Sequence, residues 1–128
     1  MKFENTLMNA LGIEMKEVSK EKVVMTMPVD ERTRQPFGLL HGGASVALAE
    51  TVASMGAFAN VDPNEQGIVG LEINANHLKG KRDGFVTAVG TPIHIGKSTQ
   101  VWEVRITDES EQLICISRCT VAVIKLKK

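Results

Sequence analysis

The sequence is poor in the residues that mark several classes of protein. It has no tyrosine, one tryptophan, four prolines and two cysteines among 128 residues. It also has no net charge, because fifteen Lys and Arg residues balance fifteen Asp and Glu residues. Nucleic acids and membrane surfaces are anionic and attract proteins with an excess of basic residues. The composition therefore predicts that neither is the main partner.

The cysteines and the apolar segments indicate a cellular compartment. Cys115 and Cys119 lie four residues apart in a strand-like segment, which separates them by about 13 Å. A disulfide spans at most about 7 Å between Cα atoms, so the two are expected to be free thiols. The first residues contain no apolar stretch of signal-peptide length, and the longest apolar segment is too short to cross a bilayer. We expect a reduced, cytoplasmic protein.

The pattern of apolar residues predicts one α+β domain over residues 1–128. An apolar share of 43% is enough for a hydrophobic core. Helices are expected at 3–11 and 42–59. Strands are expected at 13–18, 22–29, 67–78, 85–95, 99–107 and 113–126.

Two details of strand pairing follow from local sequence. Asp-Gly pairs favour tight turns, so Asp83–Gly84 predicts a hairpin between strands 67–78 and 85–95. Simple alternation along 67–78 puts Gly70 on the same face as Glu72.

Segment 42–59 is the element around which we expect the sheet to wrap. Glu50 is its one charged residue, and the residues beside Glu50 on the helix surface have mostly small side chains. A helix that is apolar almost all round is a buried one, so Glu50 is expected where water is scarce. The small side chains would let a second helix approach closely, as across a dimer.

The start of this helix could bind an anion or polarise a carbonyl group. Gly42 and Gly43 offer free backbone N–H groups at the positive end of the helix dipole, which can act as an oxyanion hole. His41 could donate a hydrogen bond to the same oxygen. The alternatives are an ordinary glycine-rich helix start and a histidine that only caps or packs.

Glu50 follows Gly42 by eight residues, or about 12 Å along the helix axis. One chain could not bring both groups to one carbonyl, so a site that uses both must take Glu50 from a second subunit. Ser54, one turn later, could orient a water for Glu50, and Gln35 could hydrogen-bond a substrate. A buried structural carboxylate, a helix-packing serine and a plain loop glutamine are the alternatives.

Other reactive groups give weaker indications. Lys79 and Lys97 lie at turns and could meet phosphate groups, although such charges are more often only solvated. The three histidines, at 41, 77 and 94, lack metal-ligand spacing, so we expect no metal and no cofactor. No Gly-x-Ser-x-Gly elbow is present.

Two segments resemble a known family at several positions at once. The run from Gln35 to Glu50, Gln-Pro-Phe-Gly-Leu-Leu-His-Gly-Gly-Ala-Ser…Leu-Ala-Glu, resembles the hotdog-fold acyl-CoA thioesterases of the PaaI branch, as does Val69 to His77. Within that branch the sequence is most similar to the 1,4-dihydroxy-2-naphthoyl-CoA thioesterases of menaquinone synthesis and to 4-hydroxybenzoyl-CoA thioesterases. The resemblance implies a single hotdog domain, with an antiparallel sheet wrapped around one long central helix.

The resemblance also implies roles for residues. The Gly42 amide would polarise the thioester carbonyl, and Glu50 of the partner subunit would act as general base or nucleophile. Gln35 and His41 would hold the thioester, and Ser54 would position the water. The implied CoA contacts are Gly70, His77, Leu78, Lys79, Gly80, His94, Ile95, Gly96, Lys97, Ser98 and Thr99. The implied assembly is a dimer with shared sites, paired into a tetramer.

Three functions are consistent with this sequence. The first is hydrolysis of an acyl-CoA thioester with an aromatic acyl group. The second is a hotdog hydratase or dehydratase, but these use a His–Asp pair and no Asp accompanies His41. The third is a non-catalytic acyl-CoA binding module, against which Glu50 and Ser54 argue.

Overall fold

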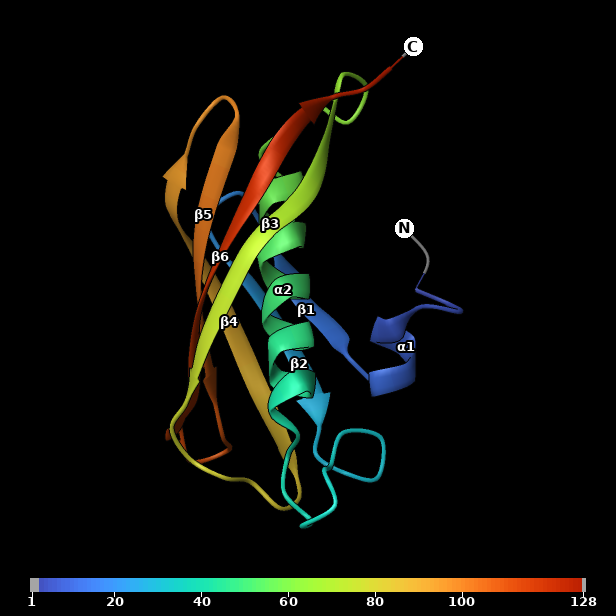
Figure 1. Cartoon of the computed structure of the whole chain (residues 1–128), viewed down its shortest axis with the longest axis vertical. Helices are drawn as coiled ribbons and strands as arrows, with labels where there is room; N and C mark the ends of the chain where they lie inside the picture. The colour runs from blue at the N-terminus through green and yellow to red at the C-terminus, as the bar shows by residue number, and fades with distance from the viewer. Residues whose placement is uncertain (1–2, 128) are drawn as a thin grey trace.

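A computed structural model of the chain describes residues 3–127. It shows one antiparallel sheet that curls around a long central helix (Figure 1), as the resemblance implies. The helices are α1 (Leu7–Leu11) and α2 (Gly42–Phe58). The strands are β1 (Glu14–Val18), β2 (Val23–Pro28), β3 (Gln66–His77), β4 (Phe85–Ile95), β5 (Thr99–Thr107) and β6 (Leu113–Lys125). Among residues 3–127, no helix has the length and apolar character needed to cross a bilayer.

The strand order differs from the sequence expectation in one respect. The order is β1-β2-β4-β5-β6-β3, so β3 pairs with β6 and not with β4. The predicted hairpin at Asp83–Gly84 is therefore wrong. The connection after β3 is tied elsewhere, since Leu78 N donates to Ile114 O and Leu40 N donates to Lys81 O. These contacts override a turn signal that is purely local.

A β-bulge in β3 changes which side chains face the helix. Gly70 pairs with Val121 and Glu72 with Thr120, which leaves Leu71 as an extra residue. An extra residue shifts the alternation by one, so Gly70 faces α2 while Glu72 faces outward. The prediction that Gly70 and Glu72 share a face is wrong for this reason. Leu71 itself is 59% exposed.

The core lies between α2 and the concave face of the sheet. Leu48 and Val52 of α2 are fully buried, as is Trp102 of β5. A Cβ atom on Gly56 would lie 2.5 Å from the Trp102 ring, so this helix position must be glycine for the indole to fit. Leu48 and Val52 thus belong to the face of α2 that meets the sheet.

Strand β3 is an edge of the sheet, with β1 at the other edge. Its free edge is twelve residues long, contains no proline, and carries Val69 and Leu71 as exposed apolar side chains. Unpaired N–H and C=O groups along such a strand are a template for pairing with another chain.

A buried polar link fastens the end of α2 to β5. Gln100 is 1% exposed, and its Nε2 donates to the backbone oxygen of Ala57 at 3.2 Å. Its Oε1 accepts a hydrogen bond from Trp102 Nε1 at 3.0 Å. One amide therefore satisfies both a helix-end carbonyl and the buried indole N–H.

Replacing Gln100 by leucine should destabilise the fold. The Gln100→Leu variant leaves the indole N–H buried without a partner and removes one of the donors to the Ala57 carbonyl, which still accepts from Asn60 N. The lost partner should lower the free energy of unfolding by about 1–3 kcal/mol. Urea unfolding followed by tryptophan fluorescence measures this. Gln112→Leu, at an exposed turn, is the matched control and should change stability little. Equal stability of both variants would contradict the role of Gln100.

Candidate active site

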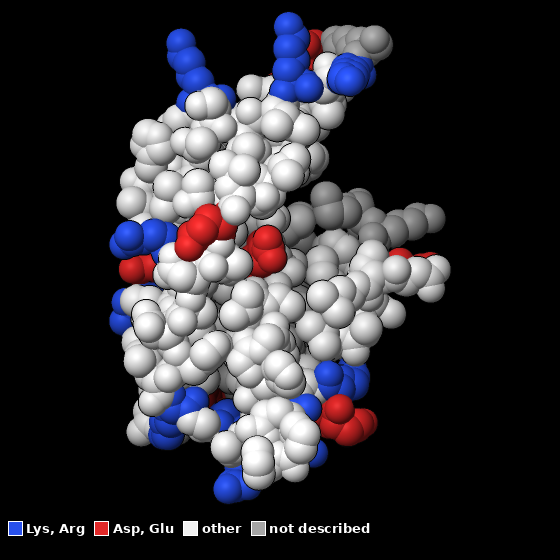
Figure 2. All heavy atoms as spheres, in the orientation of Figure 1, with Lys and Arg blue, Asp and Glu red and all other residues white. Residues whose placement is uncertain are grey.

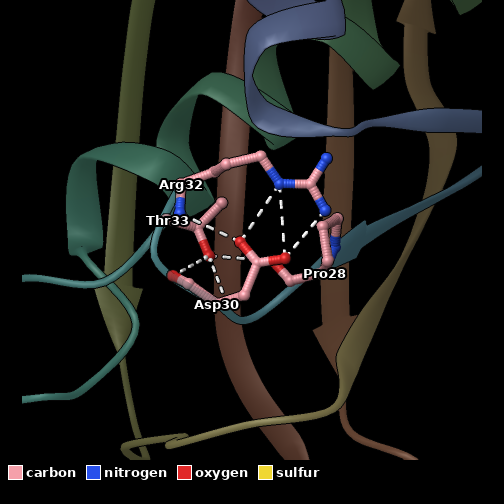
Figure 3. A network of polar contacts seen from close by, with 4 residues as sticks. All are labelled: Pro28, Asp30, Arg32 and Thr33. Carbon is pink, nitrogen blue, oxygen red and sulfur yellow. Dashed lines mark hydrogen bonds and ion pairs between the residues drawn. The ribbon is translucent and has the colours of Figure 1, made fainter.

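The loop before α2 is held by a compact polar network (Figure 3). Asp30 N donates to Thr33 Oγ1 at 3.2 Å, and the same hydroxyl donates to Pro28 O at 2.8 Å. The Arg32 guanidinium pairs with the Asp30 carboxylate at 2.7 Å and holds the pKa of that carboxyl below its usual value. Thr33 O then accepts a hydrogen bond from His41 N at 2.8 Å. The network thus fixes the residue from which α2 begins.

The first N–H groups of α2 differ in how they are used. His41 is the N-cap, and its Nδ1 accepts a hydrogen bond from Gly43 N at 2.8 Å. Ala44 N and Ser45 N both donate to His41 O. Within residues 3–127 no group accepts a hydrogen bond from Gly42 N. Gly42 therefore presents a free donor at the positive end of the helix.

The Gly42 donor opens into a cavity of about 350 Å³. The cavity is lined by Gln35, Leu39, Leu40, Gly42, Ser45, His77, Leu78, Lys79, Gly80 and Ile114. The structure thus brings together six of the residues predicted for the site, from the loop, α2, and the end of β3 and its following turn. A Cβ atom on Gly42 would lie 2.9 Å from His77 Nε2, so only glycine allows the imidazole to lie so close to the backbone.

Gln35 is oriented by its own loop. Its Oε1 accepts a hydrogen bond from Phe37 N, while Gln35 N donates to Leu39 O at 2.8 Å. Because the carbonyl end of the side chain is occupied, its amide nitrogen remains as a donor. His41 is held by the hydrogen bond that its Nδ1 accepts from Gly43 N. A neutral imidazole that accepts at Nδ1 carries its proton on Nε2, so this nitrogen is the donor.

Glu50 does not lie where the sequence predicted. It is exposed in the single chain, and among the described residues it has no ion pair or hydrogen bond. Its carboxylate lies over β3, where a Cβ atom on Gly70 would be 2.7 Å from Oε2. The expectation of burial is wrong for one chain because the face of α2 around Glu50 is not covered by the sheet.

Gly70 has a structural neighbour that the sequence analysis did not predict. It was expected as a CoA contact, whereas in the structure the Glu50 carboxylate lies directly over it. The available signal was a glycine inside a strand, which often marks a bulge or a close approach. Ser54, one helical turn beyond Glu50, is half-buried, and no described residue hydrogen-bonds its hydroxyl.

The predicted contacts at the β4–β5 turn lie away from this site within one chain. Gln100, which follows the turn, bonds to Ala57 at the far end of α2 from Gly42. Lys97 lines a separate cavity with Asp62 and Gln66. His94, Ile95, Gly96, Lys97, Ser98 and Thr99 are therefore not brought to the helix start by the single chain.

A buried thiol near Glu50 takes no nucleophilic part. Burial raises the pKa of Cys119 to about 11, and the carboxylates of Glu50 and Glu72 add to this shift. The group stays a neutral thiol at physiological pH, and the thiolate is the reactive form.

Comparison with known proteins identifies the family. The model of the thioesterase superfamily matches residues 37–115. The chain belongs to this superfamily. ComA2 of Bacillus subtilis, named as an esterase, is 60% identical over 98% of this chain and 99% of its own length. The 1,4-dihydroxy-2-naphthoyl-CoA hydrolase of Listeria monocytogenes is 57% identical over 95% of this chain and 98% of its own.

Solved structures agree with this assignment. A crystal structure of a variant of thioesterase PA1618 from Pseudomonas aeruginosa superposes with a TM-score of 0.94 at 48% identity. It covers 97% of this chain and 89% of that one. The protein is a hotdog thioesterase, and the reaction it catalyses is the hydrolysis of a thioester.

The free Gly42 donor can be removed without removing the helix start. Gly42 is the first helical residue, where proline is tolerated. Gly42→Pro lacks the N–H and should lower kcat about 10²–10³-fold, as loss of one oxyanion donor does. Gly42→Ala is the matched control, because it adds a similar contact with His77 but keeps the N–H. Thiol release measures both, and an equal loss in the two variants would contradict the role of the N–H.

Proposed function

We propose that the protein hydrolyses an acyl-CoA thioester with an aromatic acyl group, of the 1,4-dihydroxy-2-naphthoyl kind. The observation that carries this is the free Gly42 N–H at a cavity that also receives the Gln35 amide. Relatives named 1,4-dihydroxy-2-naphthoyl-CoA hydrolase, at 57% and 46% identity, support the choice of acyl group.

The chemistry follows from charge development in the thioester. As water adds to the carbonyl carbon, its oxygen becomes an anion, which Gly42 N–H and the helix dipole stabilise. Gln35 and His41 supply further donors to the thioester. As general base, a Glu50 carboxylate takes a proton from the attacking water and returns it to the thiolate that leaves when the carbon–sulfur bond breaks. As nucleophile, it attacks the carbonyl carbon and displaces the thiolate, and water then hydrolyses the resulting mixed anhydride and supplies the thiolate's proton. Either route gives the acid and the protonated thiol.

The carboxylate must come from a second subunit. Glu50 lies about 12 Å along α2 from Gly42, beyond the reach of one side chain and one water. On β3, Gly70 lies at Glu50 and His77 lies at Gly42, both on the face toward α2. Antiparallel pairing of two β3 edges with Gly70 opposite His77 of the partner subunit would therefore bring Glu50 of one chain to Gly42 of the other.

This pairing has one consistent register. Opposite residues in an antiparallel pair share a face. When Gly70 is paired with His77 of the partner subunit and the bulge residue Leu71 is left out of the count, Asn74 lies opposite its own copy, so the two-fold axis passes through Asn74. Adjacent strands lie about 4.8 Å apart, so the partner's carboxylate falls one strand spacing from His77 and Gly42. Exposed apolar side chains on β3 support a partner here, since Val69 and Leu71 are 46% and 59% exposed. Figure 2 shows Lys and Arg mainly toward the ends and one margin of this face, with acidic side chains in its middle.

The CoA phosphates would lie at the mouth of the cavity. Lys79 lines it and is held only loosely, at 3.9 Å from Asp108. Lys81 is less available, because it pairs with Glu109 at 2.6 Å. The residues from His94 to Thr99 would contribute from the partner, because antiparallel pairing brings the opposite end of the partner's sheet nearer to this site.

Glu50 should be essential for turnover and dispensable for folding. Glu50→Ala should lower thiol release about 10²–10⁴-fold, the range for loss of a general base, with unchanged thermal unfolding. A panel of naphthoyl-, benzoyl- and alkyl-CoA thioesters identifies the acyl group, and an enoyl-CoA hydration assay tests the alternative chemistry. Wild-type turnover in the Glu50→Ala variant would end this assignment.

Mixing two inactive variants tests whether the site is shared. In a dimer of one Glu50→Ala chain and one Gly42→Pro chain, shared sites place both lesions in one site and none in the other. Random mixing should then restore about a quarter of wild-type activity, because half of the dimers are mixed and each has one intact site. Sites confined to one chain would regain no activity.

The register can be checked without activity. Asn74→Cys should form a disulfide between subunits on mild oxidation, because residues at the two-fold axis are direct cross-strand neighbours. Asn76→Cys, two residues along the same face, is the control and should cross-link poorly. The mass of the native protein in solution measures the predicted dimer and tetramer at the same time.

A further inference from the structure

A second cavity lies on the other side of the helix start. It has a volume of about 260 Å³, and we call it the α1 pocket after Leu7 and Leu11 of α1, which line it. Its floor is Gly43, Ala44 and Ala47 of α2, with His41 at one side. Gly42 thus opens into the first cavity, and the next residue opens into the α1 pocket.

The two cavities differ in chemistry. The first presents the Gln35 amide, His77 and Lys79, as a polar thiol-bearing arm would require. The α1 pocket presents mainly methyl and methylene groups. The charges at its rim are engaged, since Arg32 pairs with Asp30 (Figure 3) and Arg34 Nε donates to Arg82 O at 2.9 Å.

The α1 helix lines this pocket and lies at the border of the core, against which its Met8 and Leu11 pack. It has five residues, none of them buried, and Leu7 is 63% exposed. So short a helix has little stability of its own. It is fixed by the Thr6 N-cap and by Gly12, whose φ of 74° ends it, with the Arg32 guanidinium packed against Gly12. Leu7 therefore lies at the wall of the pocket with most of its side chain outside the core.

We propose that the α1 pocket receives the acyl group of the thioester and that Leu7 and Leu11 determine which acyl groups are accepted. This rests on the proposed function, because a carbonyl oxygen on Gly42 N–H directs the thiol arm to one side and the acyl group to the other. The pocket is smaller than the usual range of about 300–1,000 Å³ for ligand cavities. It therefore suits a compact acyl group of one or two rings.

A reporter thiol tests occupancy of the pocket. Cys115 and Cys119 are both buried, and burial raises the pKa of each thiol, so Leu7→Cys adds the reactive one. A non-hydrolysable naphthoyl-CoA thioether should slow alkylation of Leu7→Cys about tenfold at ten times its Kd, whereas CoA alone should not. Ile93→Cys, on exposed β4 surface, is the control and should react equally under both conditions.

Three results would overturn the proposal. Equal protection by CoA alone would assign the pocket to the thiol arm. Absence of protection by the thioether, with turnover intact, would show that the acyl group lies elsewhere. A Leu7→Cys thiol that is unreactive without any ligand would show that the partner subunit fills the pocket.

Acyl selectivity gives a second readout. Leu7→Trp narrows the pocket and should lower the ratio of kcat/KM for naphthoyl-CoA to that for acetyl-CoA by about tenfold or more. Leu11→Ala should raise the ratio for acyl groups bulkier than naphthoyl. Ile93→Trp should leave both ratios unchanged. A wild-type enzyme that cleaves no CoA thioester defeats the proposed function, whereas an active enzyme whose ratios do not respond to Leu7 and Leu11 defeats only this inference.

Discussion

The rigidity of α2 is the constraint on which the rest of the site depends. A helix fixes the rise between residues, so the free Gly42 N–H and the Glu50 carboxylate stay about 12 Å apart along the axis in any one chain. The fold can place an oxyanion donor and a carboxylate with high precision, but it cannot bring the two together by itself. On our proposal a second copy supplies the carboxylate, and the free edge of β3 holds that copy in register.

Glycine at two positions makes this arrangement possible. Gly42 lets His77 approach the helix start, and Gly70 leaves room for the Glu50 carboxylate above β3. Gly70 belongs to β3, and Gly42 lies against His77 of the same strand. The backbone of β3 therefore fixes the distance between the two halves of the proposed site, without dependence on flexible side chains. The bulge at Leu71 contributes directly, because it turns Gly70 toward α2. In a strand of regular alternation Gly70 would face away from α2, and the Glu50 carboxylate would lose the space above it.

Much of this could be predicted from the sequence, and the failures have physical causes. Periodicity predicted α2 and the six strands nearly to their ends. Gln35 and Gly42 do meet the residues from His77 to Gly80 at one cavity. The predicted pairing of β3 with β4 was wrong because Asp83–Gly84 indicates only a local turn preference, whereas strand order depends on long-range contacts. The prediction that Glu50 is buried was wrong for the single chain. Apolar character all round a helix does not say whether the sheet or a second chain covers each face.

The division between α1 and α2 separates selectivity from chemistry. We place the groups that stabilise the transition state at the start of α2, whose buried face is part of the core, so a change there also affects folding. On our proposal the acyl group instead meets α1, which has no fully buried residue and whose Leu7 is 63% exposed. Substitutions at exposed positions of α1 can therefore alter the size and shape of the accepted acyl group at small cost in folding free energy. Such an arrangement lets one thioesterase scaffold change its substrate while its catalytic geometry stays fixed.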